Sequence, residues 1–382
     1  MVTKRSEWPS IALGQIATIH TGARNNNEKI THGKYPFFVR SAKVERIDTY
    51  SYEGEAVLVP GEGDVGNIFH YVDGKFDAHQ RVYVISNFCE RIHVPFVYWY
   101  MRRFFGMQAL RNTAKATVDS LRLPVFESFT LRIPTLNEQI AIAEVLSGFD
   151  EHLANLDELI TKKKAIRDGV LDELLTGKQR LFGFNEGWSS LALEEVAAIY
   201  DGVHQTPDYE ASGIRFVSVE DVFDLYGSAK FISQTSYLRD FKVHPSKGDV
   251  LMTRIGDIGT PAYISDEEPL AYYVSLALLK PIRINGLFLY YYIQSKSFQR
   301  ELFDRSLLHA TPKKINKGEI GFCLVTMPRN LEEQRAIASV LSSIDEEIRL
   351  LAEERAKVER LKLGAMDDLL TGRVRLPLEE EA

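Results

Sequence analysis

The sequence predicts an α+β fold in which two similar globular heads are joined by two long antiparallel helices that form a coiled coil, with a pseudo-two-fold internal repeat. Three observations support this prediction. The chain of 382 residues is too long for one ordinary hydrophobic core. It repeats itself once, and both copies end in a long stretch without proline that has the apolar spacing of a helix. An apolar fraction of 45% and a charged fraction of 26% are typical of a globular protein.

The internal repeat is clearest in its back part. Residues 136–181 align without a gap to residues 331–376, with 22 of 46 positions identical, from LNEQIAIAEVL and LEEQRAIASVL to LLTGKQRL and LLTGRVRL. Upstream, WPSIALGQIATIHTG (8–22) matches WSSLALEEVAAIYDG (188–202). The chain is therefore a tandem duplication of a unit of about 190 residues. We expect head one at 1–135, a first helical region at 136–181, head two at 182–330, and a second helical region with an acidic tail at 331–382.

Helix start and stop signals bound the back part of each copy. Thr135 and Glu138 have the spacing of a capping box, and Asn330 and Glu333 repeat it. A glycine stands where a left-handed stop would fall in both copies, in the LLTG motif. The intervening stretch of about 40 residues would be about 60 Å long as a helix.

Apolar side chains in these helices step by four, three and four residues, which is typical of a coiled-coil seam. An amphipathic helix that lies on a globular core is the alternative, but the length and the charged remainder of both stretches favour the coiled coil. Head two, with an expected radius of gyration of about 15 Å, is too compact to return the chain along a 60 Å helix. The helices are therefore expected to run antiparallel. The seam positions are Phe149, Leu153, Leu156 and Ile160, with Ile344, Ile348 and Leu351 in the second copy.

The front part of each copy has mixed character. Short apolar or alternating runs between Gly, Pro and Asp predict strands, and VPFVYWYMRRFFGMQAL (94–110) and LFLYYYIQSKSFQRELF (287–303) predict helices. The predicted strands are AVLVP (56–60), RVYVI (81–85), IRFVSV (214–219), DVLMTRI (249–255) and VSLALLK (274–280).

The common catalytic signatures are missing from the sequence. It contains no GxxxxGK[ST], GxSxG or HExxH motif and no Pro-Pro pair. Cys89 and His93 have C-x3-H spacing, but the second copy does not supply a matching ligand pair, so we expect no metal site. Asp64 and Asp257 recur in GDVG and GDIG, where a strand-to-turn element that needs positive φ at glycine is favoured over a pair of catalytic carboxylates. The sequence therefore predicts no active site.

The cellular compartment is predicted from features that the sequence lacks. The two cysteines lie far apart in the sequence, no run of about 18 apolar residues occurs, and the first residues have no apolar signal-peptide core. We expect a cytoplasmic protein.

The distribution of charge along the chain gives a different indication of the ligand from the net charge. A net charge of -7 and a pI of 5.8 argue against a nucleic-acid binder. Divided by segment, however, the net charge is +4 in head one, -3 and -5 in the helical regions, and -3 in head two. Both heads also carry basic clusters at matching places, which favour DNA as the ligand. These clusters are Arg102, Arg103, Arg111, Lys115 and Arg122, and Lys296, Arg300, Arg305, Lys313, Lys314 and Lys317.

The order of head, LxEQxxIAxxL helix, LLTGxxRL, second head and second such helix resembles the specificity subunit of type I restriction-modification systems, over essentially the full length. The resemblance implies that the heads are two target recognition domains, each reading half of a bipartite DNA site, and that the helical regions set the spacer. It also implies two modification subunits that carry S-adenosylmethionine and methylate adenine at N6, and restriction subunits that use ATP and Mg. This chain itself would be noncatalytic and hold no cofactor.

Candidate site residues follow from the resemblance and from residue type. The helical regions are expected to form the coiled coil and to contact partner subunits through Gln139, Leu146, Phe149, Leu153, Leu156, Gln334, Leu341, Ile344, Ile348 and Leu351. The family's threonine-containing segment that faces DNA corresponds to Lys115, Thr117 and Arg122, and to Thr311, Lys313, Lys314 and Lys317. Arg24, Arg40, Gln80, Arg81, Gln205 and Arg254 are further DNA candidates, because Arg favours guanine and Gln favours adenine in the major groove.

Two alternatives remain open from the sequence. A solitary adenine methyltransferase system without restriction subunits needs the same recognition subunit. A noncatalytic coiled-coil scaffold whose heads bind protein or glycan is the rival of another class, and the acidic net charge supports it.

Overall fold

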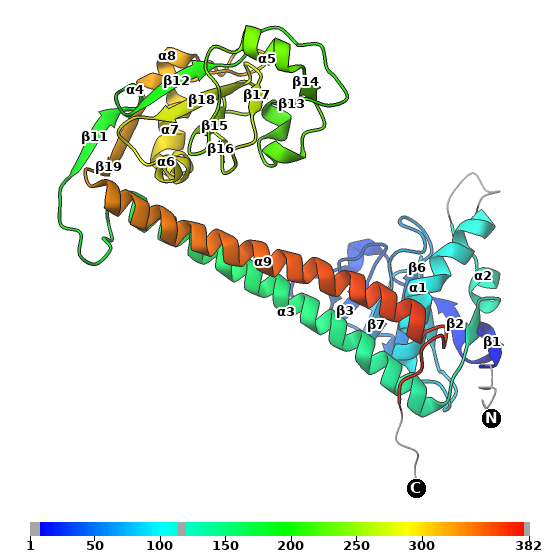
Figure 1. Cartoon of the computed structure of the whole chain (residues 1–382). Coiled ribbons are helices and arrows are strands. Elements are labelled where there is room, and N and C mark those ends of the chain that lie inside the picture. The colour runs from blue at the N-terminus through cyan, green and yellow to red at the C-terminus, as the bar shows by residue number, and fades with distance from the viewer. Residues whose placement is uncertain (1–7, 114–119, 378–382) are drawn as a thin grey trace. The chain divides into compact units, whose positions relative to one another are not determined.

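The structure is a computed structural model, and it describes residues 8–113 and 120–377 (Figure 1). The chain divides into two compact units. Unit 1 comprises residues 1–157 and 353–382, and unit 2 comprises residues 158–352. Each unit therefore contains one head and one half of each long helix. No described helix is long and apolar enough to cross a membrane.

Head one is built on two small sheets. The first has the antiparallel order β2-β9-β6-β7, and the second has the order β4-β3-β8-β5, with β3 parallel to β8. A separate pair, β1 with β10, closes the domain next to the helices α1 and α2 (Figure 1). The elements are β1 (Ser10–Ala12), β2 (Thr18–Thr21), β3 (Tyr35–Phe38), β4 (Glu45–Ile47), β5 (Tyr52–Glu53), β6 (Ala56–Pro60), β7 (His70–Val72), β8 (Lys75–Ala78), β9 (Val82–Ser86), α1 (Val94–Thr113), α2 (Leu123–Glu127), β10 (Thr130–Arg132), and the 3-10 turns η1 (Leu13–Gln15) and η2 (Asn26–Glu28).

Head two repeats this topology, except that its described residues form no counterpart of β5. Its first sheet has the order β12-β18-β15-β16, and its second has the order β14-β13-β17, with β13 parallel to β17. The pair β11 with β19 matches β1 with β10. The elements are β11 (Trp188–Ala192), α4 (Leu193–Val196), β12 (Ala197–Asp201), β13 (Ile214–Val217), η3 (Val219–Asp221), η4 (Leu225–Gly227), β14 (Phe231–Ile232), α5 (Gln234–Asp240), β15 (Val250–Thr253), β16 (Pro261–Tyr263), β17 (Leu270–Tyr272), β18 (Leu276–Pro281), α6 (Gly286–Ile293), α7 (Lys296–Arg305), α8 (Lys317–Gly321) and β19 (Leu324–Pro328).

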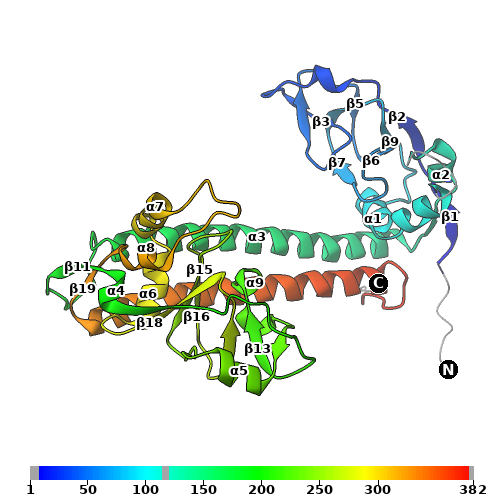
Figure 2. The same cartoon turned by 90° about the horizontal axis from the view of Figure 1, so that it is seen from above.

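The two long helices are α3 (Leu136–Leu175) and α9 (Leu331–Leu369), and they lie side by side (Figure 1 and Figure 2). Ion pairs give their direction. In unit 1 Lys362 pairs with Asp150 and Arg355 pairs with Asp157, and in unit 2 Lys163 pairs with Glu347 and Arg167 with Asp345. Residue numbers rise along one helix as they fall along the other, which confirms the predicted antiparallel arrangement.

The seam residues of the helix pair are shielded from solvent. Leu153 and Leu156 are buried, and Phe149 and the seam residues of α9 are half-buried. Beyond this seam, each head shares its core with the helix ends. Leu146 and Leu370 join the core of head one, and Leu341 and Leu175, which stand at the matching repeat positions, join that of head two. The fold class predicted from the repeat is therefore confirmed.

Two local predictions differ from the structure. The helix expected at 287–303 is broken into α6 and α7, because Gln294 ends the first piece and the hydroxyl of Ser295 caps the second by accepting from Phe298 N–H at 3.3 Å. The capping box at Thr135 and Glu138 forms as predicted. The matching capping box predicted at the start of α9 does not form. Asn330 accepts from Glu332 N–H at 2.8 Å, and the carboxylate of Glu333 accepts from Arg180 instead.

Candidate nucleic-acid interface

A glycine loop follows the same strand in both heads and defines equivalent surfaces. In head one it follows β6, and Leu121 N–H donates to the carbonyl of Gly61 at 2.8 Å. In head two it follows β15, and Ile315 N–H donates to the carbonyl of Arg254 at 3.0 Å. Leu121 in head one and Ile315 in head two therefore lie against equivalent loops.

The glycines of these loops adopt the conformation that the sequence predicts. Gly63 and Gly66 have φ of 94° and 78°, and Gly256 and Gly259 have φ of 82° and 93°. The loop carboxylates serve the turns themselves. Asp64 accepts from the side-chain amide of Asn67 at 2.6 Å, and Asp257 accepts from the hydroxyl of Thr253 at 3.1 Å. GDVG and GDIG are therefore turn elements, as expected.

Head one brings Arg40, Gln80 and Arg81 together around a hollow of about 450 Å³. Arg40 and Arg81 both pair with the carboxylate of Glu62, at 3.5 and 2.8 Å, and both side chains are more than half exposed. His79 lies beside them, and its Nδ1 accepts from Arg81 N–H at 3.0 Å. Burial, followed by the charges of Arg40 and Arg81, lowers the pKa of His79. The hollow therefore presents guanidinium groups, a neutral imidazole and amides.

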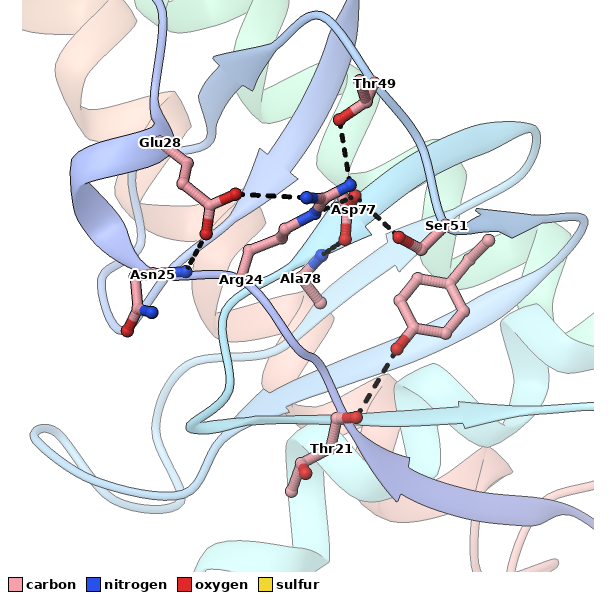
Figure 3. A network of polar contacts seen from close by, with 9 residues as sticks. Thr21, Arg24, Asn25, Glu28, Thr49, Ser51, Asp77 and Ala78 are labelled. Carbon is pink, nitrogen blue, oxygen red and sulfur yellow. Dashed lines mark hydrogen bonds and ion pairs between the residues drawn. The ribbon is translucent and has the colours of Figure 1, made fainter.

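Arg24 lies next to this hollow but is engaged inside the protein. Its Nε donates to Asp77 at 3.0 Å, Nη1 to Glu28 at 3.1 Å and Nη2 to Thr49 at 3.1 Å (Figure 3). Asp77 is fully buried and also accepts from the hydroxyl of Ser51 and the backbone N–H of the next residue. This network favours a structural role for Arg24 over the base contact that its residue type suggested.

Arg254 in head two is another candidate that the structure places inside. Its side chain is 9% exposed, pairs with Asp201, and donates from Nε to the carbonyl of Ile315 at 3.2 Å. From its place in the glycine loop, the guanidinium of Arg254 therefore contacts both the end of β12 and Ile315, the residue after Lys314. This arrangement, like that of Arg24, favours a structural role.

The remaining candidates of head two are exposed. Gln205 and Lys317 line a hollow of about 900 Å³ beside α5. The side chains of Thr311, Lys313 and Lys314 are exposed as well. The backbone under the lysines is fixed, because the carbonyl of Lys313 accepts from Gly256 N–H and that of Lys314 accepts from Leu307 N–H, both at 2.8 Å. Head two therefore offers cations on an ordered segment.

In head one the matching segment is only partly described. Lys115 and Thr117 lie outside the described residues, and Arg122 is exposed at the start of α2. Two arginines of the predicted basic cluster are engaged elsewhere. Arg102 pairs with Asp150 at 2.8 Å and Arg103 with Asp367 at 2.7 Å, so both arginines face the long helices.

Gln139 and Gln334 are predicted to belong to the coiled-coil and partner region. Both are fully buried and each is bonded to its own head. Gln139 Oε1 accepts from His93 N–H at 2.9 Å, and Gln334 Oε1 accepts from Asn285 N–H at 2.8 Å. The EQ motif therefore fastens each helix to its head, which favours a structural role for these glutamines over a contact with a partner subunit.

The sequence reasoning missed several residues of the head-one hollow. Asn25, Asn26 and Asn27 line it together with Glu62. The sequence could have indicated them, because three polar residues in a row begin three positions after Gly22, where the stretch aligned between the two copies ends. At Gly22 and at its counterpart Gly202 an added Cβ would lie within 2.4 Å of a backbone carbonyl oxygen, so in both heads the chain passes close against the end of the equivalent strand, β8 or β17. Among the described residues, no three His, Cys, Asp or Glu side chains are grouped to hold a metal ion.

Comparison with known proteins identifies the family. The model of the type I restriction modification DNA specificity domain matches residues 5–165 and again residues 185–360. The MjaVIII specificity subunit of Methanocaldococcus jannaschii is 25% identical over 302 residues, which cover 72% of this chain and 70% of that protein. The EcoBI specificity subunit of Escherichia coli is 24% identical over an alignment of 384 positions, which covers 88% of this chain and 79% of that protein.

A solved structure shares the fold. The crystal structure of a type I restriction-modification system S subunit from M. genitalium superimposes with a TM-score of 0.67 at 18% identity, and 97% of each chain is covered. Specificity subunits are the noncatalytic DNA-recognition components of type I restriction-modification complexes. Since the family model matches both copies of the repeat, this chain belongs to the family of type I restriction-modification specificity subunits.

Proposed function

We propose that the chain reads a bipartite DNA site, one half-site with each head, and scaffolds the modification subunits of a type I restriction-modification complex. One observation carries the proposal. The two heads share a strand order apart from β5, and the turns after Gly22 and Gly202 lie against equivalent strands, yet the exposed side chains on these turns differ. Two domains that bind different DNA sequences need a similar backbone arrangement with different exposed side chains, because side-chain hydrogen bonds distinguish the base edges.

The exposed groups of each head suit different parts of DNA. Lys313 and Lys314 are point charges on a fixed backbone, which suits phosphate oxygens. Arg40 and Arg81 carry a fork of N–H donors that matches guanine O6 and N7, and the amides of Gln80 and Gln205 match adenine N6 and N7. Phosphate contacts position a protein, and base contacts specify the sequence.

Partner subunits complete the proposed complex. The repeated helical regions carry matching sequences at both ends of the helix pair, and this suits two copies of one partner. We assign S-adenosylmethionine and the methylation of adenine N6 to two modification subunits, and ATP with Mg to restriction subunits where these accompany the complex. In a solitary adenine methyltransferase system the chain would act in the same way without restriction subunits.

A selection experiment tests the proposed function. The chain is mixed with its modification subunit and a pool of random duplexes, and the retained DNA is sequenced. We expect two short conserved half-sites separated by a fixed number of unspecified base pairs, with affinity that falls as salt increases. Recovery of no bipartite motif, together with binding that is insensitive to salt, would overturn the proposal and favour a scaffold whose heads bind protein or glycan.

A further inference from the structure

The turn Asn25–Asn27 in head one is held in place by charged neighbours. Glu28 accepts from Asn25 N–H at 2.7 Å and from Arg24 at 3.1 Å (Figure 3). The side-chain amide of Gln80 donates to Asn25 Oδ1 at 2.7 Å. On the other side, Arg24 N–H donates to the carbonyl of Ala78 at 3.2 Å. The turn is therefore tied to strand β8 and to the residues that follow it.

Arg24 is the central contact of this arrangement. A buried carboxylate such as that of Asp77 requires a partner charge, and the guanidinium of Arg24 supplies it. Its three nitrogens bind three different side chains, which come from the turn, from β8 and from the segment before β5. Because the guanidinium fork is planar and rigid, these bonds fix the direction of the turn as well as its position.

Asn26 and Asn27 are the groups that the turn leaves available. Both side chains are exposed, and neither forms a hydrogen bond with any residue in 8–113 or 120–377. Both line the hollow that also contains Arg40 and Arg81. Two unengaged amides on a fixed backbone beside two arginines form a set of donors and acceptors suited to base edges.

Head two has a turn at the same place with different side chains. Val203 N–H donates to the carbonyl of Tyr272 at 3.2 Å, as Arg24 N–H does to Ala78, so Val203 is the counterpart of Arg24. The residues that follow Val203 are His204, Gln205 and Thr206, and they also line a hollow. The two heads therefore agree in the backbone position of this turn but differ in its side chains.

We propose that Asn26 and Asn27 read one or two neighbouring A·T base pairs in the half-site of head one, each through the N6 and N7 of one adenine, and that Arg24 is the positioning residue that holds them. The proposal rests on the proposed function, because it requires that head one reads DNA. An Asn side chain offers one donor and one acceptor in the spacing that the major-groove edge of adenine presents. Arg24 acts through the turn and does not contact the base.

The test uses the chain in complex with its modification subunits, and random-duplex selection followed by binding to single-substitution duplexes. In the Asn26→Ala and Asn27→Ala variants we expect preference at one or two neighbouring A·T positions of one half-site to fall about 5- to 150-fold. The other half-site and the spacer stay unchanged. Asn137→Ala, which removes an exposed amide from α3, is the matched control and leaves both half-sites unchanged.

Arg24→Lys separates positioning from stability. The lysine keeps a charge opposite Asp77 but lacks the fork that joins Glu28 and Thr49, so we expect a thermal midpoint near that of the unaltered chain and reduced preference at the same A·T positions. An unchanged motif in all three variants overturns the proposal. Equal weakening for every sequence with a smaller salt dependence overturns it too, since Asn26 and Asn27 would then contact phosphates. Selection of no motif by the unaltered chain overturns the proposed function, and with it this proposal.

Discussion

Arg180 donates two hydrogen bonds to the carboxylate of Glu333, at 2.6 and 2.7 Å, and so joins the residues after α3 to the first turn of α9. The second copy of the repeat forms the matching pair in unit 1, where Arg375 lies 3.5 Å from Glu138. The arginine of LLTGxxRL and the glutamate of LxEQ therefore meet at both ends of the helix pair. Their pairing explains why these two motifs are the most similar parts of the repeat.

The tryptophan that opens each head completes the same junction. The guanidinium of Arg180 lies 5.7 Å from the ring of Trp188, and that of Arg375 lies 5.2 Å from the ring of Trp8. The glycine of each LLTG motif lies against the same ring, in a left-handed conformation with φ of 69° or 70°. A side chain at this glycine would be strained and would crowd the ring.

Removal of Arg180 is expected to destabilise the junction of unit 2. Arg180→Ala leaves the carboxylate of Glu333, which is fully buried, without its partner. We expect the free energy of local opening at the start of α9 to fall by about 3 kcal/mol, the lower end for a buried pair, because Arg180 is itself 29% exposed. Native-state hydrogen exchange of the amides in the first turns of α9 measures this.

A surface pair on the same helix is the control for this prediction. Arg335 pairs with Glu332, and both side chains are more than half exposed. Arg335→Ala should change the opening free energy by less than about 1 kcal/mol. Equal effects of the two substitutions would contradict the assigned role of Arg180.

Gln139 is expected to act in stability and not in partner binding. Its side chain accepts from His93 N–H and donates to the carbonyls of Arg91 and Pro134, both at 3.0 Å. Gln139→Leu fills a similar volume but leaves these backbone groups without partners, so we expect a loss of about 2 kcal/mol or more in the free energy of unfolding. Urea denaturation measures the loss. Weaker binding of a modification subunit with unchanged stability would indicate a partner contact instead.

The repeat allowed the topology to be predicted, because two copies of one sequence pattern must bury the same faces. Helix limits followed from local signals, as the glycines of the LLTG motifs show. Side-chain partners were the part that the sequence could not supply. Glu333 had the right spacing for a capping box, yet a distant residue, Arg180, takes its carboxylate. Arg102 and Arg103 looked like a DNA-facing cluster, and only the fold brings Asp150 and Asp367 to them.

The same reason explains which site residues were misjudged. Exposed candidates such as Arg40 and Arg81 lie together because the fold brings both beside the carboxylate of Glu62. Arg254 has the residue type of a base reader, but Asp201, at the end of β12, holds it inside the protein. Residue type gives the chemistry of a side chain, whereas burial and pairing decide whether that chemistry faces a ligand.

Lys313 and Lys314 are expected to contact phosphates. The double substitution Lys313→Ala and Lys314→Ala should weaken DNA binding for all sequences and reduce the slope of log K against log salt by about 1.8, since each phosphate contact contributes about 0.9. Titrations at several salt concentrations measure the slope. Lys247→Ala is the control, because Lys247 is exposed near the opposite end of β15. A changed half-site with an unchanged slope would mean that the lysines read bases.

Cys323 is expected to resist alkylation in the folded protein. Burial raises the pKa of its thiol to about 12, so the thiolate is scarce throughout the range from pH 7 to pH 9. Cys89 is only half-buried and should be the thiol that iodoacetamide labels. Mass spectrometry should find one label per chain in buffer and two in urea. Rapid labelling of Cys323 in buffer would contradict the packing described for head two.

The length of the helix pair is expected to set the spacer between the half-sites. Deletion of four residues from 157–164 and four from 352–359 removes opposite parts of α3 and α9, which pair through Asp157 and Arg355. Each helix is shortened by about 6 Å, close to the rise of two base pairs. We expect selection to return the same two half-sites with a shorter spacer.

Deletion from one helix alone separates a shortened spacer from general damage. It moves the two halves of the seam out of register, so that Asp157 no longer lies opposite Arg355 or Lys163 no longer lies opposite Glu347. A large loss of stability is expected for that variant, and the paired deletion should keep most of it because both helices are shortened together. If the paired deletion folds and binds with the original spacer, the helices do not set the spacing, and the distance between the half-sites must be fixed by the partner subunits.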